Sequence, residues 1–158
     1  MLFLLLQLGN DRYALEAHRV VEVVPLLELK QLPQAPKGVA GVFNYRGQPV
    51  PAIDLSELTL GRPAREWLST RIIIVRHPNP GGPEHLLGLV AERATEMLRQ
   101  DASAFVDAGV RVEGAPYLGP VLMDSKGVVQ WIHEERLLPA SVRDLLFSST
   151  RALTDAID

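Results

Sequence analysis

A predicted tight turn brings together the two residues of this sequence that are best suited to binding a partner. Tyr45 and Arg46 lie within residues 44–47, Asn-Tyr-Arg-Gly, between apolar runs at residues 39–43 and 50–55. Asn and Gly tolerate the positive φ angles of tight turns, so these residues predict a strand–turn–strand hairpin. An arginine on such a turn presents a planar set of N–H donors to carboxylates, or to the free carbonyls at a helix end.

Two acidic residues are candidates to bind Arg46 within the chain instead. Glu22 is a single acid among valines, and it is either a contact for a partner or the structural partner of Arg46. Asp54 is a further candidate, but it is interpreted mainly as a cap for a helical turn expected at residues 56–60, where Ser56 is a second candidate cap. An internal salt bridge would fix the turn, and it is compatible with partner binding by the same arginine.

The valines around Glu22 are a second candidate binding feature. Val20, Val21, Val23 and Val24 fit either a short helix or a bent strand, because periodicity does not decide over so short a window. The four side chains cannot all be buried in a core. Those that face outward would form an apolar patch of the kind found at interfaces, although most strand valines belong to the core.

The four histidines give little support for a metal site. His77 and His85 flank a proline-rich loop and could meet across a hairpin, whereas His18 and His133 stand alone. Two histidines without a third ligand make a poor zinc site, so all four are predicted to lie on the surface. Residues 80–83, Pro-Gly-Gly-Pro, lack the lysine and the following helix of a phosphate loop. No catalytic residue, metal or cofactor is predicted.

Composition narrows the class of protein. The chain has 158 residues, of which 16 are basic and 19 acidic, with a net charge of −3 and no cysteine. The acidic balance disfavours nucleic-acid binding, because phosphate binding needs concentrated Lys and Arg. Without cysteine there is no disulfide and no thiolate metal site. The apolar residues 1–6 lack a basic region and a cleavage site, and no run is long enough to cross a bilayer, so a cytoplasmic protein is expected.

Short runs separated by turns predict an all-β fold. Strands are expected at residues 2–8, 12–16, 39–43, 50–55, 71–76, 85–91, 94–98, 117–123 and 128–132. Residues 100–111 are expected to form a loop with a helical turn. A C-terminal helix is expected after residue 134, with Ser141 as its cap and Val142, Leu145 and Leu146 on one face. The chain is expected to form one domain whose two lobes divide near residues 61–69, with a frayed tail at 148–158.

The predicted hairpin resembles the hallmark segment of the CheW-like family of chemotaxis coupling proteins. That pattern reads Gly-Val-x-Asn-aliphatic-Arg-Gly, followed by an apolar strand that ends in Pro-x-x-Asp-Leu. The matching residues are Gly41, Val42, Asn44, Arg46, Gly47, Pro51, Asp54 and Leu55. Further matches lie at residues 8–23, 72–90 and 117–138, so the resemblance covers almost the whole chain in order. The chain departs from the pattern at Tyr45, where the family usually has leucine.

The resemblance implies an all-β fold of two packed five-stranded SH3-like barrels with short helices and a C-terminal helix. It also implies an adaptor, recruited to membrane receptor arrays, that joins the cytoplasmic tip of a chemoreceptor-like protein to the regulatory domain of a CheA-like histidine kinase. Other CheW-like modules are further candidate partners. Carried over by position, the receptor-binding residues are Val20, Glu22, Val23, Tyr45 and Arg46. The expected kinase-binding residues, on exposed apolar strands, are Ile72, Ile74, Leu87 and Val90. The residues expected to build the turn are Asn44, Gly47 and Asp54.

Two other functions stay open on sequence alone. Small β-barrels also bind nucleic acids, which the acidic balance and the scattering of the nine aromatic residues disfavour. A metal-dependent hydrolase is favoured only by the histidines.

Overall fold

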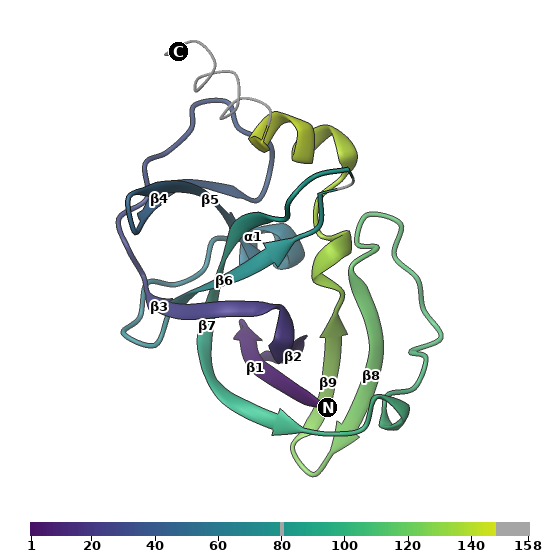
Figure 1. Cartoon of the computed structure of the whole chain (residues 1–158). Coiled ribbons are helices and arrows are strands. Elements are labelled where there is room, and N and C mark those ends of the chain that lie inside the picture. Colours follow the sequence, from purple (N-terminus) through teal and green to yellow (C-terminus); the bar gives the residue numbers. More distant parts are fainter. Residues whose placement is uncertain (80, 148–158) are drawn as a thin grey trace.

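Strands are the dominant secondary structure, as the sequence predicts. The computed structural model describes residues 1–79 and 81–147, except for the side chain of residue 95. The strands are labelled β1 to β9 in Figure 1, and the helices between them are short. The predicted tail at residues 148–158 lies outside the described residues.

One five-stranded sheet combines the two ends of the chain. β1 (Leu2–Leu8) forms an antiparallel hairpin with β2 (Asp11–Glu16), which pairs in parallel with β9 (Gly127–Ile132). β8 (Leu118–Asp124) is antiparallel to β9. On its other side, β1 pairs with the C-terminal half of β7 (His85–Arg99). Figure 1 shows this sheet curving around the N-terminus.

The second five-stranded sheet comes from the middle of the chain. β3 (Val20–Pro25) pairs antiparallel with β6 (Arg71–His77), which pairs antiparallel with the N-terminal half of β7. β5 (Gln48–Asp54) is parallel to β7 and antiparallel to β4 (Val39–Tyr45). The expected division near residues 61–69 does not separate the two sheets, because each sheet takes strands from both sides of it.

A single long strand, β7, connects the two sheets. It has 15 residues, whereas two separate strands were expected at 85–91 and 94–98. Ala91 is its last residue paired with β6, and Glu92 is its first residue paired with β1. Arg93 follows with a positive φ of 53°. The polar pair at 92–93 therefore marks the point where the strand changes neighbours, and not the end of a strand.

Strand β6 is buried on both faces, as its run of β-branched residues predicts. Ile73 and Val75 belong to a central core, to which strands of both sheets contribute. Ile72 and Ile74 belong to a second core, inside the sheet of β3 to β7. A third core around Phe3 fills the sheet formed by the chain ends.

Helix α1 (Leu55–Leu60) begins at Asp54. The Asp54 carboxylate accepts hydrogen bonds from the backbone N–H groups of Ser56 and Glu57 at 3.0 and 3.2 Å. Asp54 is therefore the N-cap, which confirms one interpretation of the sequence. The assignment of Ser56 as the cap is wrong, because Ser56 lies buried inside the first turn.

A second helix covers residues 140–147, after a 3₁₀ turn η3 (Glu134–Arg136). Ser141 lies inside this helix, so it is not the cap that the sequence suggested. Val142 and Leu146 pack on the central core, whereas Leu145, expected on the same face, is half exposed. The helical turn predicted within residues 100–111 is the 3₁₀ turn η2 (Ala102–Ala104).

Candidate partner-binding site

A two-residue turn joins β4 to β5 and holds Arg46 in a defined position. Arg46 and Gly47 have φ values of 53° and 82°, which is the backbone of a type I′ hairpin turn. The Asn44 side chain accepts a hydrogen bond from the Gly47 N–H at 2.8 Å. The predicted hairpin is confirmed, with one correction: Arg46, not Asn44, shares the positive φ with Gly47. Asn44 supports the turn through its side chain.

Three of the predicted receptor-binding residues meet beside this turn. The Tyr45 hydroxyl donates to Glu22 Oε2 at 2.5 Å, and Arg46 Nη2 donates to the same oxygen at 3.1 Å. The Arg46 guanidinium also lies 5.2 Å from the centre of the Tyr45 ring. The hydrogen bond to Glu22, with some desolvation, raises the pKa of Tyr45, so the phenol stays protonated as a donor. The internal ion pair with Glu22 therefore exists, and the one with Asp54 does not.

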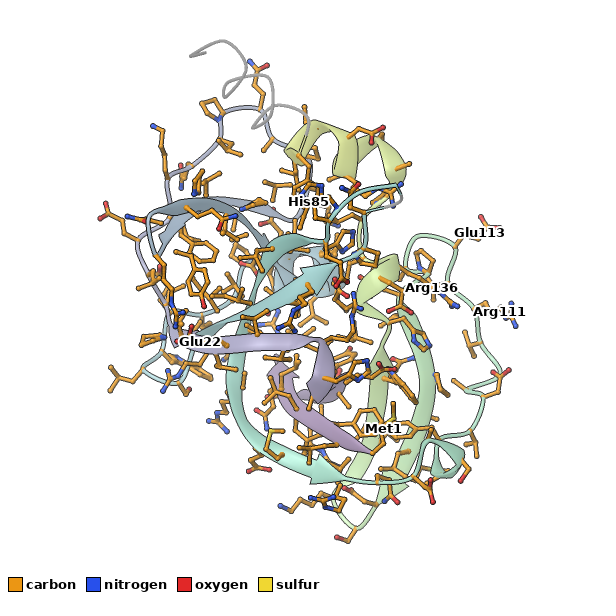
Figure 2. The ribbon with its side chains drawn as sticks, in the orientation of Figure 1. Met1, Glu22, His85, Arg111, Glu113 and Arg136 are labelled. Carbon is orange, nitrogen blue, oxygen red and sulfur yellow. The ribbon has the colours of Figure 1, made fainter. Side chains whose placement is uncertain are left out.

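Strand β3 carries the other two predicted residues along the rim of its sheet. Within the described chain β3 pairs only with β6, after the 3₁₀ turn η1 (Ala17–Arg19). Val20 and Val23 pack on the central core, whereas Val21 and Val24 pack on the core of the second sheet. All four side chains are half-buried. They form no separate outward patch, but Val20 and Val23 keep part of their surface accessible on the strand that carries Glu22, which Figure 2 labels.

The predicted exposure of the four kinase-binding residues is wrong. Ile72, Ile74 and Leu87 are fully buried, and Val90 is 4% exposed. β6 and the first half of β7 are central strands with paired neighbours, and both of their faces pack against cores. These side chains stabilise the fold and offer no surface to a partner.

Asp54 has a structural role, as the sequence indicated. Besides capping α1, it accepts a hydrogen bond from the Ala64 N–H at 2.9 Å. Burial raises the pKa of Asp54, and the three backbone N–H donors oppose that shift. The residue therefore fixes the start of the segment that leads from α1 to β6.

Sequence reasoning missed a largely buried cluster of ionisable residues from η1, the end of β6 and η3. His77 Nδ1 lies 2.8 Å from Glu134 Oε1, and Arg19 Nη2 lies 3.1 Å from Glu134 Oε2. His77 was predicted on the surface, but its side chain is fully buried, and its Nε2 has no partner within the described chain. His85 is opposite His77 on β7 and stacks on Phe147 at 4.0 Å. Burial and the neighbouring His77 lower the pKa of His85.

Nothing in the described residues forms a metal centre or a membrane-spanning helix. Across residues 1–79 and 81–147 there is no group of three or more side chains placed to hold a metal ion. Over the same residues no helix is long and apolar enough to cross a bilayer. An open cleft of about 520 Å³ lies beside β8, and its lining includes Arg111, His133 and Arg136. Figure 2 shows Arg111 and Arg136 there.

Comparison with known proteins identifies the family of this chain. Residues 2–142 match the model of the CheW-like domain. A chemotaxis protein CheW from Klebsiella aerogenes is 26% identical over 155 residues, which cover 98% of this chain and 87% of that protein. A chemotaxis protein CheW from Helicobacter pylori is 32% identical over 93 residues, which cover 58% of this chain and about half of that protein, 53%.

A solved structure supports the same assignment. The scaffolding protein TtCheW from Thermoanaerobacter tengcongensis superposes with a TM-score of 0.76 over 89% of each chain, at 22% identity. That likeness confirms the expected fold of two SH3-like barrels, which here share strand β7. The family match and the shared fold together show that this chain belongs to the CheW-like domain family.

Proposed function

We propose that this chain is a non-catalytic scaffold that couples a chemotaxis-type receptor to a CheA-like histidine kinase. Support comes from the match over residues 2–142, and from relatives named as chemotaxis and scaffolding proteins. The observation in the structure that carries the proposal is the rigid turn that presents Arg46 beside Glu22 and Tyr45. Such a protein acts by position, because it holds two partners in one assembly.

The receptor tip would bind across this turn and strand β3. The Arg46 side chain is 75% exposed, and its hydrogen bond to Glu22 uses one of the guanidinium nitrogens. The other donors suit the carboxylates or free carbonyls of a helical tip. Val20 and Val23 add partly exposed apolar surface on the adjacent strand. The type I′ turn holds the arginine before binding, so little ordering cost is added on association.

The regulatory domain of the kinase is the second partner in this proposal. Two interfaces of modest strength gain avidity when receptor, scaffold and kinase are linked in one array. The protein would be cytoplasmic and would reach the membrane through the receptor. Because the side chains of Ile72, Ile74, Leu87 and Val90 are buried, the kinase would bind a face other than β6 and the first half of β7.

A three-component binding experiment tests the function. The folded chain is mixed with a receptor tip and with a kinase regulatory domain from the same source, and the mixtures are analysed by sedimentation velocity. We expect each pair to associate and all three to form one complex. Absence of both pairwise complexes at high micromolar concentration would overturn the proposal. A gel shift at low salt is expected to show no nucleic-acid binding.

A further inference from the structure

The helix at residues 140–147 is held on the sheets by a small set of contacts. Val142, Leu146 and Phe147 pack on the central core. The Phe147 ring also stacks on the imidazole of His85, with 4.0 Å between the ring centres and 6° between the ring planes. Figure 2 shows His85 beside this helix. One of the contacts through which the helix docks is therefore made by a titratable side chain.

A second histidine lies opposite His85 in the sheet. His77, the last residue of β6, pairs with His85 on β7, and its ring centre is 6.1 Å from that of Phe147. One aromatic side chain of the helix therefore packs against both imidazoles. His77 is fully buried, and its Nδ1 lies 2.8 Å from Glu134 Oε1. The other oxygen of Glu134 contacts Arg19 at 3.1 Å, so this carboxylate is already engaged.

The charged groups on the elements around His85 do not neutralise it. They lie on η1, β6, the loop before β7, η3 and the helix, and they are Arg19, Arg76, Glu84, Glu134, Arg143 and Asp144. Glu84 precedes His85 in the chain, but its carboxylate lies 3.4 Å from Arg19 Nη1. The residues of β5 that border the same open cleft as His85, at positions 48, 49 and 51, do not titrate. Among the described residues, His85 has no ion pair with a carboxylate.

The neutral form of His85 is the one that suits the docked helix. A protonated imidazole would gain attraction from the face of the Phe147 ring, but partial burial and the neighbouring His77 lower the pKa of His85. When the helix is undocked, the imidazole regains water and its ordinary pKa of 6.5. Docking is therefore weakened as the pH falls below that value. An open cleft of about 710 Å³ borders His85 and Phe147, so a proton can reach the site without unfolding.

We propose that His85 is a pH-sensitive contact that keeps helix 140–147 docked at neutral pH and releases it at acidic pH. Release uncovers the part of the central core on which Val142 and Leu146 pack, while the two sheets stay folded. Glu134 holds η3 in place through His77 and Arg19, so release is confined to the chain after η3. The protein then presents a different, more apolar surface at low pH. This property is independent of the proposed scaffold function.

Amide hydrogen exchange of the full chain at about pH 7.5 and about pH 5.5 tests the proposal, with each rate divided by its intrinsic rate to give a protection factor. At the lower pH the protection factors of residues 143–147 should fall at least about twofold, whereas those of β6 and β9 should not change. His85→Phe keeps an aromatic stack and removes the titration, so its helix should stay protected at both pH values. His18→Phe is the matched control, because the His18 side chain is 65% exposed on η1, and it should behave as the unmodified chain does.

Four results would overturn the proposal. Equal protection of the helix at both pH values would mean that acid does not release it. A loss of protection that persists in His85→Phe would assign the effect to another group, such as His77 or Glu134. A parallel loss in β6 and β9 would mean that acid destabilises the whole fold and not the helix alone. Absence of protection in the helix at neutral pH would mean that it is not docked in solution.

Discussion

Replacement of Glu134 by leucine should destabilise the protein strongly. The Glu134 carboxylate is 1% exposed and is shared by His77 and by Arg19, whose side chains are 0% and 22% exposed. Loss of one member of a buried ion pair costs about 3–5 kcal/mol, because the remaining charge stays desolvated. Arg19 keeps partial access to water and a second acid, Glu84, at 3.4 Å. We therefore expect the low end of that range, about 3 kcal/mol.

A double-mutant cycle measures the interaction energy of His77 and Glu134 separately from that of Arg19. Urea unfolding is measured for Glu134→Leu, His77→Leu and the double variant, with thermal melting as a second readout. A loss of about 3 kcal/mol corresponds to a fall of roughly 6–12 °C in melting temperature for a domain of this size. The double variant should recover at least about 1 kcal/mol of the summed losses, because an apolar pair suits a site whose His77 Nε2 has no partner.

Two results would refute this reasoning. A loss below about 1 kcal/mol for Glu134→Leu, with an unchanged urea dependence, would mean that the cluster is solvated in solution. Strict additivity of the two single losses would mean that His77 and Glu134 do not interact energetically.

Three further perturbations probe the fold. Gly47→Val should lower the free energy of unfolding by about 1–2 kcal/mol, because residue 47 has a φ of 82°, whereas Gly47→Asn should be nearly neutral. Equal melting temperatures for the two variants would show that the positive φ does not restrict the residue at this position. Gly88→Ala should destabilise further, because an added Cβ would lie 2.5 Å from Phe43 Cε1; an unchanged urea midpoint would contradict that packing. Arg12 lowers the pKa of Asp124 to about 2, so this pair stabilises the fold above about pH 4 and loses its effect as the pH falls towards 2. Asp124→Asn should therefore flatten that part of the curve of stability against pH. An unaltered curve would show that the pair does not contribute to stability.

The sequence predicted the local elements well, because each depends on nearby residues. The hairpin around Gly47, the cap at Asp54 and the doubly buried run of β6 follow from turn chemistry, capping and β-branched composition. The prediction of Ser141 as the helix cap is wrong, because the start of this helix depends on more than the nearby residues. The helix already begins at residue 140, and a capping motif read from sequence alone cannot show how η3 leads into it.

The pairing of distant strands could not be predicted from local patterns. Residues 85–91 and 94–98 predict two strands, whereas the folded chain forms one, in which Arg65 satisfies the Glu92 carboxylate. Likewise, no local signal connects His77 with Glu134, which are 57 positions apart. The burial of Ile72 has the same cause, since strand content does not show which strands become central in a sheet.

Part of the candidate site could be predicted from the sequence. Residue types and the family resemblance point to Tyr45, Arg46 and Glu22, and in the structure Tyr45 and Arg46 donate to the same oxygen atom of Glu22. The contact of His85 with Phe147 could not be predicted, because it depends on where the C-terminal helix docks and not on residue type.

The most direct test of the central claim is the affinity of the receptor tip for the unmodified chain and for Arg46→Ala, with the melting temperature of each sample. Arg99→Ala is the matched control, since Arg99 is an exposed arginine on β7 whose side chain has no hydrogen bond or ion pair with the described residues. We predict that Arg46→Ala loses about 2 kcal/mol of binding, or roughly 30-fold in affinity, and melts normally. The control should bind as the unmodified chain does. An Arg46→Ala variant that melts early yet binds the receptor tip at full strength would make Arg46 a structural residue and contradict the account.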